Sequence, residues 1–557
     1  MSAGLDIEKI KSESRNLRGT LIESLNDPTT GAIREADTVV SKFHGLYQQD
    51  DRDLRASRRE ARLEPLYSFM LRVRVPGGRV TRAQWDALDR LADDPGNGSL
   101  RLTTRQAIQY HGVARQSLHD LIRGIDAVGM DSLAACGDVN RNVMCHVQPE
   151  LGPLHAETLR WSERLSKHLT PATNAWREIW IDGKKADTEE LEDEPIYGKR
   201  YLPRKFKIGI AVAPYNDVDV YSQDIGLVAI ARDGALAGFN VIAGGGMGCS
   251  HGELETFPLL GQMIGFITPE QLLPVAEAIV TTQRDFGDRE NRKHARFKYT
   301  LDDRSADWLV DEIEHRCGIR PSAAEPFELI QSSDRYGWTK GVDGRWQFVV
   351  FIENGRLLPG HRAAVRQIMD GYADELRVTP NQNLAFTGIE KNKRMNVEAL
   401  LAEAGLEDGA DISPIRRHSM ACVAMPTCGL AMAEAERYLP DLISRIEELA
   451  ARHGISEQPV MVRMSGCPNG CSRPFLGEIG LVGRAPGRYN LYLGAAFSGE
   501  RLSKLVLDNA DEAAILDSID GWFERYAAER QPDEALGDFA VRSGLVAAVV
   551  HGSEVHA

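Results

Sequence analysis

The sequence predicts an α+β protein of three domains, related by an internal pseudo-twofold duplication and preceded by an N-terminal extension. Three observations predict this fold. Runs of alternating apolar residues, such as "KFKIGIAVA" and "WQFVVFI", are typical of strands, whereas "PDLISRIEELAARHG" repeats apolar residues at helical spacing. Two segments recur later in the chain in altered form. Finally, 557 residues are too many for a single hydrophobic core.

The first repeat begins at Phe69. "FMLRVRVPGGRVTRAQWDALDRLADD" aligns with "FVVFIENGRLLPGHRAAVRQIMDGYADE", and each copy predicts a strand, a glycine turn and a helix before a second strand. A second repeat pairs "DIGLVAIARDGALAGFNVIAGGG" with "EIGLVGRAPGRYNLYLGAA". Copies of about 250 residues are too long for a solenoid, so a duplication about a pseudo-twofold axis fits better. Arg105 in the first copy falls on Asn381, and the second copy keeps the thiols, so we expect one site to be retained and its counterpart lost.

The repeats suggest boundaries for the domains. We expect an N-terminal extension, a central domain made of two duplicated halves, and two further domains: residues 1–67, 68–134 with 337–409, 135–336, and 410–557. The extension is polar and charged, and its segment "FHGLYQQDDRD" could be a solvated arm. Within residues 135–336, Thr268 and Gln271 predict a capping box at the start of a helix.

Charge and composition exclude several classes of protein. A formal net charge of −15 argues against binding nucleic acid through a global positive field, so any anionic ligand must be held by local Arg and Lys. "MSAGLDIEKIKSESRNLRG" lacks the apolar core of a secretory signal, and no run approaches the roughly 18 apolar residues of a membrane span. We expect a cytoplasmic protein with reduced cysteines, in which paired cysteines indicate metal or redox chemistry.

Four cysteines form two such pairs, Cys422 with Cys428 and Cys467 with Cys471. Structural zinc usually takes two pairs that are each separated by about two to four residues, and the first spacing here is longer. The small apolar neighbours in "SMACVAMPTCGL" favour an iron–sulfur cluster, whose potential depends on solvent exclusion and backbone hydrogen bonds. Zinc and inert buried thiols remain the alternatives. The other cysteines are scattered and are expected to be small buried hydrophobes: Cys136, Cys145, Cys249 and Cys317.

These motifs resemble the sulfite and nitrite reductases that carry sirohaem and a [4Fe–4S] cluster. The resemblance rests on "SMACVAMPTCGLAMAEAERYLP", "RMSGCPNGCSRPFLGEIGLVGRAPGRYNLYLG", "LRLTTRQAIQYHG", "DVNRNVMCHVQP" and "YLPRKFKIGIAV", and covers nearly the whole chain. It is closest to the haemoprotein (β) subunit of assimilatory sulfite reductase. It implies ferredoxin-like halves in the central domain, a first sirohaem and substrate domain at 135–336, and a second domain at 410–557 that carries the cluster.

The resemblance also implies roles for single residues. Cys422, Cys428, Cys467 and Cys471 would bind the cluster, and Cys471 would also bridge to the sirohaem iron. The sirohaem carboxylates would need buried cations, for which guanidinium forks are well suited. The cofactor-binding residues that it implies are Arg101, Arg105, Gln109, His111, Arg204, Arg296, Asn469 and Cys471. If "RLTTRQAIQYHG" is one strand, Arg101, Arg105 and Gln109 share a face.

The open face of the iron would be lined by Arg72, Arg141, Lys205 and Lys207. In "KFK" the two lysines point the same way with Phe206 opposite. Arg stays charged and suits sulfite binding, whereas Lys can shift its pKa and deliver protons. Taken without the resemblance, a random Arg is usually a surface charge, and "RKFK" would be read as a solvated edge strand.

The function that follows is six-electron reduction of sulfite to sulfide, in assimilatory sulfur metabolism and cysteine biosynthesis. Nitrite reduction to ammonia with the same cofactors is the alternative, and a zinc-bearing structural protein is a third. "GFNVIAGGGMGCSHG" lacks the spacing of a dinucleotide-binding fingerprint, and we interpret it as backbone packed against the macrocycle. Electrons should therefore come from another protein, a flavoprotein that oxidises NADPH or a ferredoxin.

Overall fold

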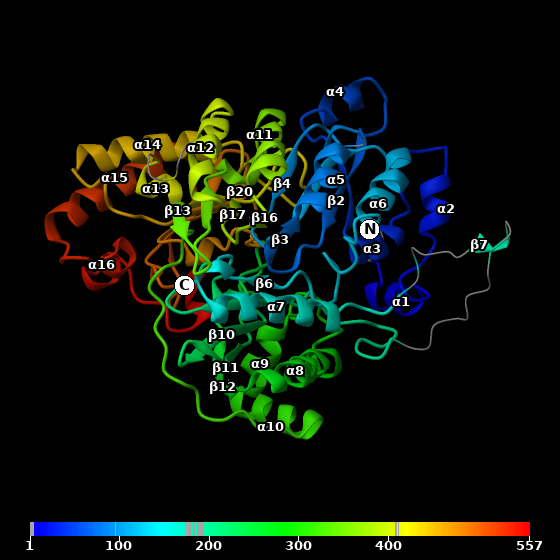
Figure 1. Cartoon of the computed structure of the whole chain (residues 1–557), viewed down its shortest axis with the longest axis horizontal. Helices are drawn as coiled ribbons and strands as arrows, with labels where there is room; N and C mark the ends of the chain where they lie inside the picture. Colours follow the sequence, from blue (N-terminus) through cyan, green and yellow to red (C-terminus); the bar gives the residue numbers. More distant parts are fainter. Residues whose placement is uncertain are drawn as a thin grey trace.

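The computed structural model describes residues 5–556 except 95, 174, 176–179, 182–183, 186–193, 407–408 and 410–411. Residue 410, where the last predicted domain begins, therefore lies outside the described residues. Helices and sheets alternate along the chain (Figure 1), which confirms the predicted mixed fold. Among the described residues, no helix is long and apolar enough to cross a membrane.

Two sheets of identical topology confirm the duplication. In both, three parallel strands are followed by an antiparallel meander. The first has the order β12-β11-β10-β9-β6: Gln262–Ile267, Ala235–Ala243, Ile225–Arg232, Ile208–Val212 and Met144–Cys145. The second has the order β22-β21-β20-β19-β18: Lys504–Ala510, Arg488–Leu493, Ile479–Ala485, Val462–Ser465 and Ser419–Ala421.

Two further sheets lie between them and exchange strands. One has the order β1-β2-β5-β4-β15: Leu46–Asp50, Tyr67–Val73, Ile108–Val113, Leu100–Leu102 and Arg356–Leu357. The other has the order β13-β14-β17-β16-β3: Gly337–Lys340, Trp346–Val350, Leu384–Ile389, Glu375–Val378 and Arg79–Thr81. Because β3 and β15 each pair with the other half, the two halves of the central domain interlock.

Helices cover these sheets at the positions that the patterns predict. Those of the central domain are α5, α6, α11 and α12: Arg82–Asp93, Leu118–Asp126, Pro359–Gly371 and Arg394–Glu403. Those of the first outer domain are α7 to α10: Pro153–His168, Leu272–Phe286, Phe297–Arg304 and Ala306–Cys317. Those of the second are α13 to α16: Pro414–Arg417, Leu439–Arg452, Glu512–Glu529 and Leu536–Arg542. The predicted capping box of Thr268 and Gln271 is present ahead of α8.

The N-terminal extension is not a solvated arm. Short helices, α1 to α3, precede β1: Ile7–Ser12, Leu21–Asn26 and Asp37–Ser41. Strand β1 pairs with β2 along its whole length, and Phe43 and Leu46 are buried. The aromatic residues of "FHGLYQQDDRD" therefore belong to the core, and only its acidic end leads outward to helix α4, Arg55–Glu60. The division into domains stays a prediction.

The segment "RLTTRQAIQYHG" is a hairpin, and the prediction of a single strand with one shared face is wrong. Strand β4 ends at Leu102, and the side-chain oxygen of Thr103 accepts hydrogen bonds from the backbone N–H groups of Arg105 and Ala107. Hydroxyl side chains that bond their own backbone favour turns over strands. Arg101 and Gln109 are nevertheless neighbours, because they face each other across the β4–β5 pair.

The two halves of the central domain are also joined by a buried ion pair between α5 and α11. Arg362 donates to the Asp89 carboxylate at 2.7 Å and to the Asp89 carbonyl at 2.9 Å, and both side chains are about 2% exposed. Arg366 also contacts Asp89, but its side chain is 48% exposed.

We predict that Asp89→Ala lowers the free energy of unfolding by about 3–5 kcal/mol, because it removes the buried carboxylate of Arg362 and leaves this guanidinium only the exposed carboxylate of Asp93. Arg366→Ala, which removes the exposed partner of the same carboxylate, should cost less than about 1 kcal/mol. Urea unfolding followed by circular dichroism measures both. Equal stabilities of the two variants would show that the buried pair does not hold the halves together.

Candidate functional site

The predicted cluster cysteines lie at the carboxyl ends of two adjacent parallel strands. Cys422 directly follows β18, and Cys467 lies in the loop after β19. The backbone N–H of Gly466 donates to the Cys422 sulfur at 3.3 Å, and the Asn469 amide donates to the Cys467 sulfur at 3.4 Å. Because adjacent parallel strands end at the same edge of a sheet, the second repeat brings both loops together.

The thiols are close enough to influence one another's ionisation. Burial and the neighbouring thiols of Cys471 and Cys467 raise the pKa of Cys422 well above its ordinary value. Burial and Cys471 raise the pKa of Cys467 to about 11, and they also raise the pKa of Cys428. Three thiols with raised pKa values are suited to a cationic group that stabilises thiolates.

The arrangement fits a cluster better than a single ion. Within the described ranges, no three His, Cys, Asp or Glu side chains converge on a point where one metal ion could bind. An iron–sulfur cluster is larger than one ion, so its cysteine ligands lie further apart. The donor set, four thiols with N–H groups directed at two of the sulfurs, has the chemistry that a [4Fe–4S] cluster would need, and the assignment of these cysteines stays a prediction.

The predicted substrate cations come from the other copy. Arg141 precedes β6, and Lys205 and Lys207 precede β9. A short pairing fixes their register: Val139 accepts from the Phe206 N–H at 3.0 Å, and Phe206 accepts from the Arg141 N–H at 3.0 Å. Phe206 is fully buried, so the lysines on either side of it point to the opposite face, as predicted.

The substrate cations form one electrostatic group, because neighbouring cations add to burial in lowering the pKa of each lysine. Burial and the charges of Arg141, Arg204 and Arg296 lower the pKa of Lys205 to about 7. Burial, Lys205 and Arg105 lower the pKa of Lys207 well below its ordinary value. The Cys471 sulfur acts in the opposite direction on Lys205, so the thiol lies within electrostatic range of the lysine. A site with so much uncompensated positive charge is complementary to anions.

Arg72 lies on the same side of the site as these cations, and the hairpin of the central domain holds it in place. With the Gln109 amide assigned so that its oxygen faces Arg72, it accepts hydrogen bonds from Arg72 Nη2 at 2.8 Å and Nε at 3.0 Å. The amide nitrogen then donates to His111 Nε2 at 3.2 Å. Burial and nearby arginines lower the pKa of His111 to about 3, so this imidazole is neutral and accepts the hydrogen bond. Gln109 and His111 thus orient Arg72.

Arg105 and Arg296 each keep a buried N–H group without a partner. Arg105 donates to Gln223 and to the carbonyl of Asn142, both at 2.8 Å, and Arg296 pairs with Asp224 at 3.1 Å. The Nε atoms of both arginines are buried and have no hydrogen-bond acceptor among the described residues. Orphaned charged donors are costly, so a carboxylate ligand at this position would complete them.

Two of the predicted cofactor residues have different surroundings. Arg101 pairs with Glu436 at 2.6 Å and donates to the carbonyl of Ala421, the residue before Cys422. Its guanidinium therefore already has a carboxylate in the protein and supports the thiol loop from behind. Arg204 lies near Asp138 and Arg292. Burial and the charge of Arg292 lower the pKa of Arg204 to about 10, although Asp138 acts in the opposite direction.

The glycine-rich loop closes the space between the two copies. A β-carbon at Gly245 would lie 2.2 Å from the Tyr221 carbonyl oxygen, and one at Gly246 would lie 2.9 Å from Arg296 Nη2, so neither position has room for a side chain. The N–H of Cys249 donates to the carbonyl of Pro468 at 2.8 Å, which ties the loop to the thiols. The loop packs closely against protein groups on both sides, and its predicted packing against the macrocycle stays a prediction.

Sequence reasoning missed a buried pair beside the substrate cations. The Tyr47 hydroxyl contacts the Cys136 sulfur, and the Arg72 guanidinium lies 5.7 Å from the Tyr47 ring centroid. Burial acts to raise the pKa of Cys136, but Arg141 and Arg72 outweigh it and lower the pKa to about 7. Cys136 is buried as predicted, but its surroundings are charged. The aromatic residues of "FHGLYQQDDRD" were the one sequence signal that this segment could contribute to the site.

The duplicated position in the first copy has lost the thiols, as predicted. His146 directly follows β6, just as Cys422 follows β18, and its Nδ1 pairs with Asp217 at 3.0 Å while its ring stacks on Tyr215. Asn381, the counterpart of Arg105, donates to Asp334 at 3.1 Å. At this duplicated position, buried neutral and acidic side chains stand where the functional position has thiols and cations.

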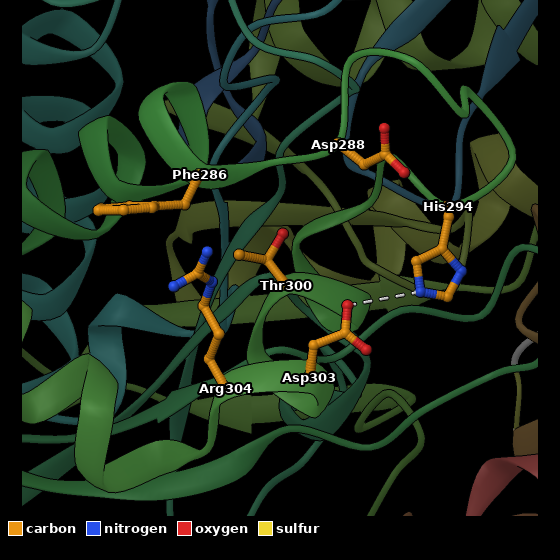
Figure 2. Close-up of a pocket in the computed structure, with 6 residues that line it drawn as sticks. All are labelled: Phe286, Asp288, His294, Thr300, Asp303 and Arg304. Carbon is orange, nitrogen blue, oxygen red and sulfur yellow. Dashed lines mark ion pairs between the residues drawn. The ribbon is translucent and has the colours of Figure 1, made fainter.

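A pocket of about 350 Å³ lies elsewhere on the first outer domain (Figure 2), and none of the predicted site residues lines it. His294 and Asp303 form an ion pair across it at 3.7 Å, and the guanidinium of Arg304 lies over the ring of Phe286. Its charged groups are thus paired or stacked with one another.

Known proteins match this chain over almost its whole length. The nitrite/sulfite reductase ferredoxin-like half domain matches residues 63–128 and 340–404, and the nitrite and sulphite reductase 4Fe-4S domain matches residues 160–320. The latter match falls on the first copy, whereas the thiols lie on the second. The NirA protein of Mycobacterium tuberculosis shares the fold with a TM-score of 0.78 at 23% identity, covering 97% of each chain.

Curated relatives are more similar in sequence. The proteins named sulfite reductase [NADPH] hemoprotein beta-component of Shouchella clausii and Geobacillus kaustophilus are 51% and 50% identical. Each alignment covers 99% of this chain and 97% of the relative. The chain therefore belongs to the nitrite and sulfite reductase family.

Proposed function

We propose that this chain is the haemoprotein subunit of an assimilatory sulfite reductase, in which sulfite, six electrons and six protons give sulfide and water. The observation that carries the proposal is that the two copies bring their loops together, through the hydrogen bond from the Cys249 N–H to the Pro468 carbonyl, with Lys205 and Arg141 of one copy in electrostatic range of the Cys471 thiol of the other. When bound, sirohaem and a [4Fe–4S] cluster joined through one thiolate would supply the electrons. Identity of about 50% to proteins named for sulfite favours sulfite over nitrite as the substrate.

The chain's own residues supply anion binding and protons. Arg72 and Arg141 would hold the sulfite oxygens, because guanidinium remains charged at all relevant pH values. Lys205 and Lys207 would bind the same anion and deliver protons as oxygen leaves as water, because burial and neighbouring cations lower the pKa values of both lysines. The Phe206 register holds these groups in place before substrate arrives.

Other residues would position the cofactors. Arg105 and Arg296 offer their orphaned N–H groups to sirohaem carboxylates, with Arg204 nearby, while Gln109, His111 and Arg101 act from behind by orienting Arg72 and the thiol loop. Asn469 would stabilise the Cys467 thiolate through its amide. Cys422, Cys428, Cys467 and Cys471 would bind the cluster, with Cys471 shared between the two groups.

Electrons would come from a flavoprotein that oxidises NADPH, in the cytoplasm. The relatives' names contain NADPH, and this sequence has no dinucleotide-binding fingerprint. Ferredoxin is the other candidate donor.

Turnover with a chemical reductant tests the function without any partner. With reduced methyl viologen, the purified holoprotein should convert sulfite to sulfide, and kcat/KM for sulfite should exceed that for nitrite. Faster turnover of nitrite would make the chain a nitrite reductase, and turnover of neither anion would end the proposal.

We predict that Cys471→Ser removes the visible spectrum of both cofactors, because a hydroxyl is a poor ligand for soft iron and this sulfur would be shared. Cys317→Ser is the matched control, since Cys317 lies at the end of α10. Iron content and absorption of the two purified variants provide the comparison. A Cys471→Ser protein with the parental spectrum would refute the shared ligand.

We predict that Lys207→Ala keeps both cofactors but lowers kcat/KM for sulfite roughly a hundred- to thousandfold, because a preorganised charge is lost. Arg105→Ala should instead lower sirohaem occupancy first, because its guanidinium is assigned to the macrocycle. Rates normalised to sirohaem content separate the two effects. If Lys207→Ala reduced sulfite at the parental rate per sirohaem, Lys207 would not act on the substrate and would be a solvated residue at a strand edge.

A further inference from the structure

Helix α4 projects from the top of the molecule in Figure 1 and buries none of its own residues. Arg55, Arg58 and Arg59 lie at helical spacing on one face of it, and Arg62 follows in the turn after the helix. We call these four residues the Arg face. An isolated six-residue helix is marginal in water. This one buries no residue and is held to its own chain by polar contacts, Arg55 with the Asp50 carboxylate and Arg58 with the Glu64 carbonyl. Its outward surface is therefore available to a partner.

The composition around the helix is that of a protein interface. Leu54, Leu63 and Leu66 are 40%, 56% and 45% exposed, which is unusual for three leucines within one short segment. Residues 51–66 contain five arginines and no lysine, and arginine is enriched while lysine is depleted in interfaces. Among the described residues, Arg59 and Arg62 form no ion pair, so their charges are free to meet an external anion.

The segment before α4 leads directly to the thiol loop. Arg52 donates through its backbone N–H to the carbonyl of Pro426 at 3.4 Å, and through its guanidinium to the carbonyl of Cys428 at 3.3 Å. Asp53 pairs with Arg437 at 2.8 Å. Leu430, two residues after Cys428, is 67% exposed. A protein bound on the Arg face would thus lie beside the outer edge of the predicted cluster site.

Charge identifies the kind of partner. The chain carries a net charge of −15, so an acidic electron carrier would be repelled by most of its surface. A local arginine surface with exposed leucines beside the cluster loop gives such a carrier one favourable place to dock. We propose that the Arg face, with Leu54, Leu63 and Leu430, binds the acidic surface of an FMN-carrying electron-donor domain. This inference rests on the proposed function, which requires an external source of electrons.

The test uses flavodoxin, an acidic FMN protein, as the probe. Its dissociation constant is measured with the full holoprotein at low and at about 0.3 M salt. The variant Arg59→Glu/Arg62→Glu should weaken binding at low salt by about tenfold or more and reduce the salt dependence. It should fold normally, since these two side chains form no ion pair in the described chain.

The matched control is Arg320→Glu/Arg452→Glu, which makes the same change in net charge. Arg320 follows α10 and Arg452 ends α14, and both side chains are exposed. In Figure 1, α10 lies at the bottom and α14 at the left, whereas α4 lies at the top. Its affinity for flavodoxin should stay within about twofold of the parent, because exposed ion pairs contribute little and distant charges are screened. The rate of electron transfer from photoreduced flavodoxin should be similar in the parent and the control, and lower in the Arg59→Glu/Arg62→Glu variant.

The docking proposal is wrong if the Arg59→Glu/Arg62→Glu protein binds flavodoxin like the parent, or if the parent has no salt-sensitive affinity for it. Sulfite reduction by methyl viologen, a small cation that needs no docking surface, should be equal in all three proteins. A parent that binds flavodoxin but cannot reduce sulfite with methyl viologen would refute the proposed function and leave the docking surface standing.

Discussion

Seven buried or partly buried cationic side chains that act on one another electrostatically impose the constraint on which the rest of the structure depends. They are Arg72, Arg105, Arg141, Arg204, Lys205, Lys207 and Arg296, and few carboxylates accompany them. Like charges at such short range repel, and burial strengthens the repulsion. The fold must therefore hold the cations by rigid backbone pairing. Anionic ligands would compensate their charge. The predicted macrocycle carboxylates and the predicted sulfite would both neutralise this one group of cations.

The pseudo-twofold duplication is how the chain meets this constraint. One copy supplies Arg141, Lys205 and Lys207, and the other supplies the thiol loops, so no single domain assembles the site. Asp219 of the first copy ties them together, because it is buried and pairs with both Arg463 and Arg473 of the second. These two arginines outweigh its burial and hold the pKa of Asp219 below its ordinary value. Arg473 also donates to the carbonyl of Thr104, which reaches the hairpin of the central domain.

The sequence predicted the class of fold and the duplication, because alternation and repeats are local patterns, whereas the site that joins thiols and cations was implied by the resemblance and stays a prediction. Sequence reasoning failed where tertiary contacts decide. The alternation around Arg105 suggested a strand, but the hydroxyl of Thr103 closes a turn there. Arg101 was assigned to a ligand carboxylate, but Glu436, far away in sequence, already pairs with it. Tyr47 and Cys136 each looked unremarkable, and only folding brings them together beside Arg72.

The central claim is that one thiolate, Cys471, joins the sirohaem iron to the cluster at the meeting point of the two copies. Mössbauer spectroscopy of holoprotein enriched in the Mössbauer-active iron isotope tests this claim most directly. A shared sulfur predicts that the paramagnetic sirohaem iron imposes a magnetic field on every iron of the cluster. A cluster spectrum that shows no magnetic influence of the sirohaem would contradict it.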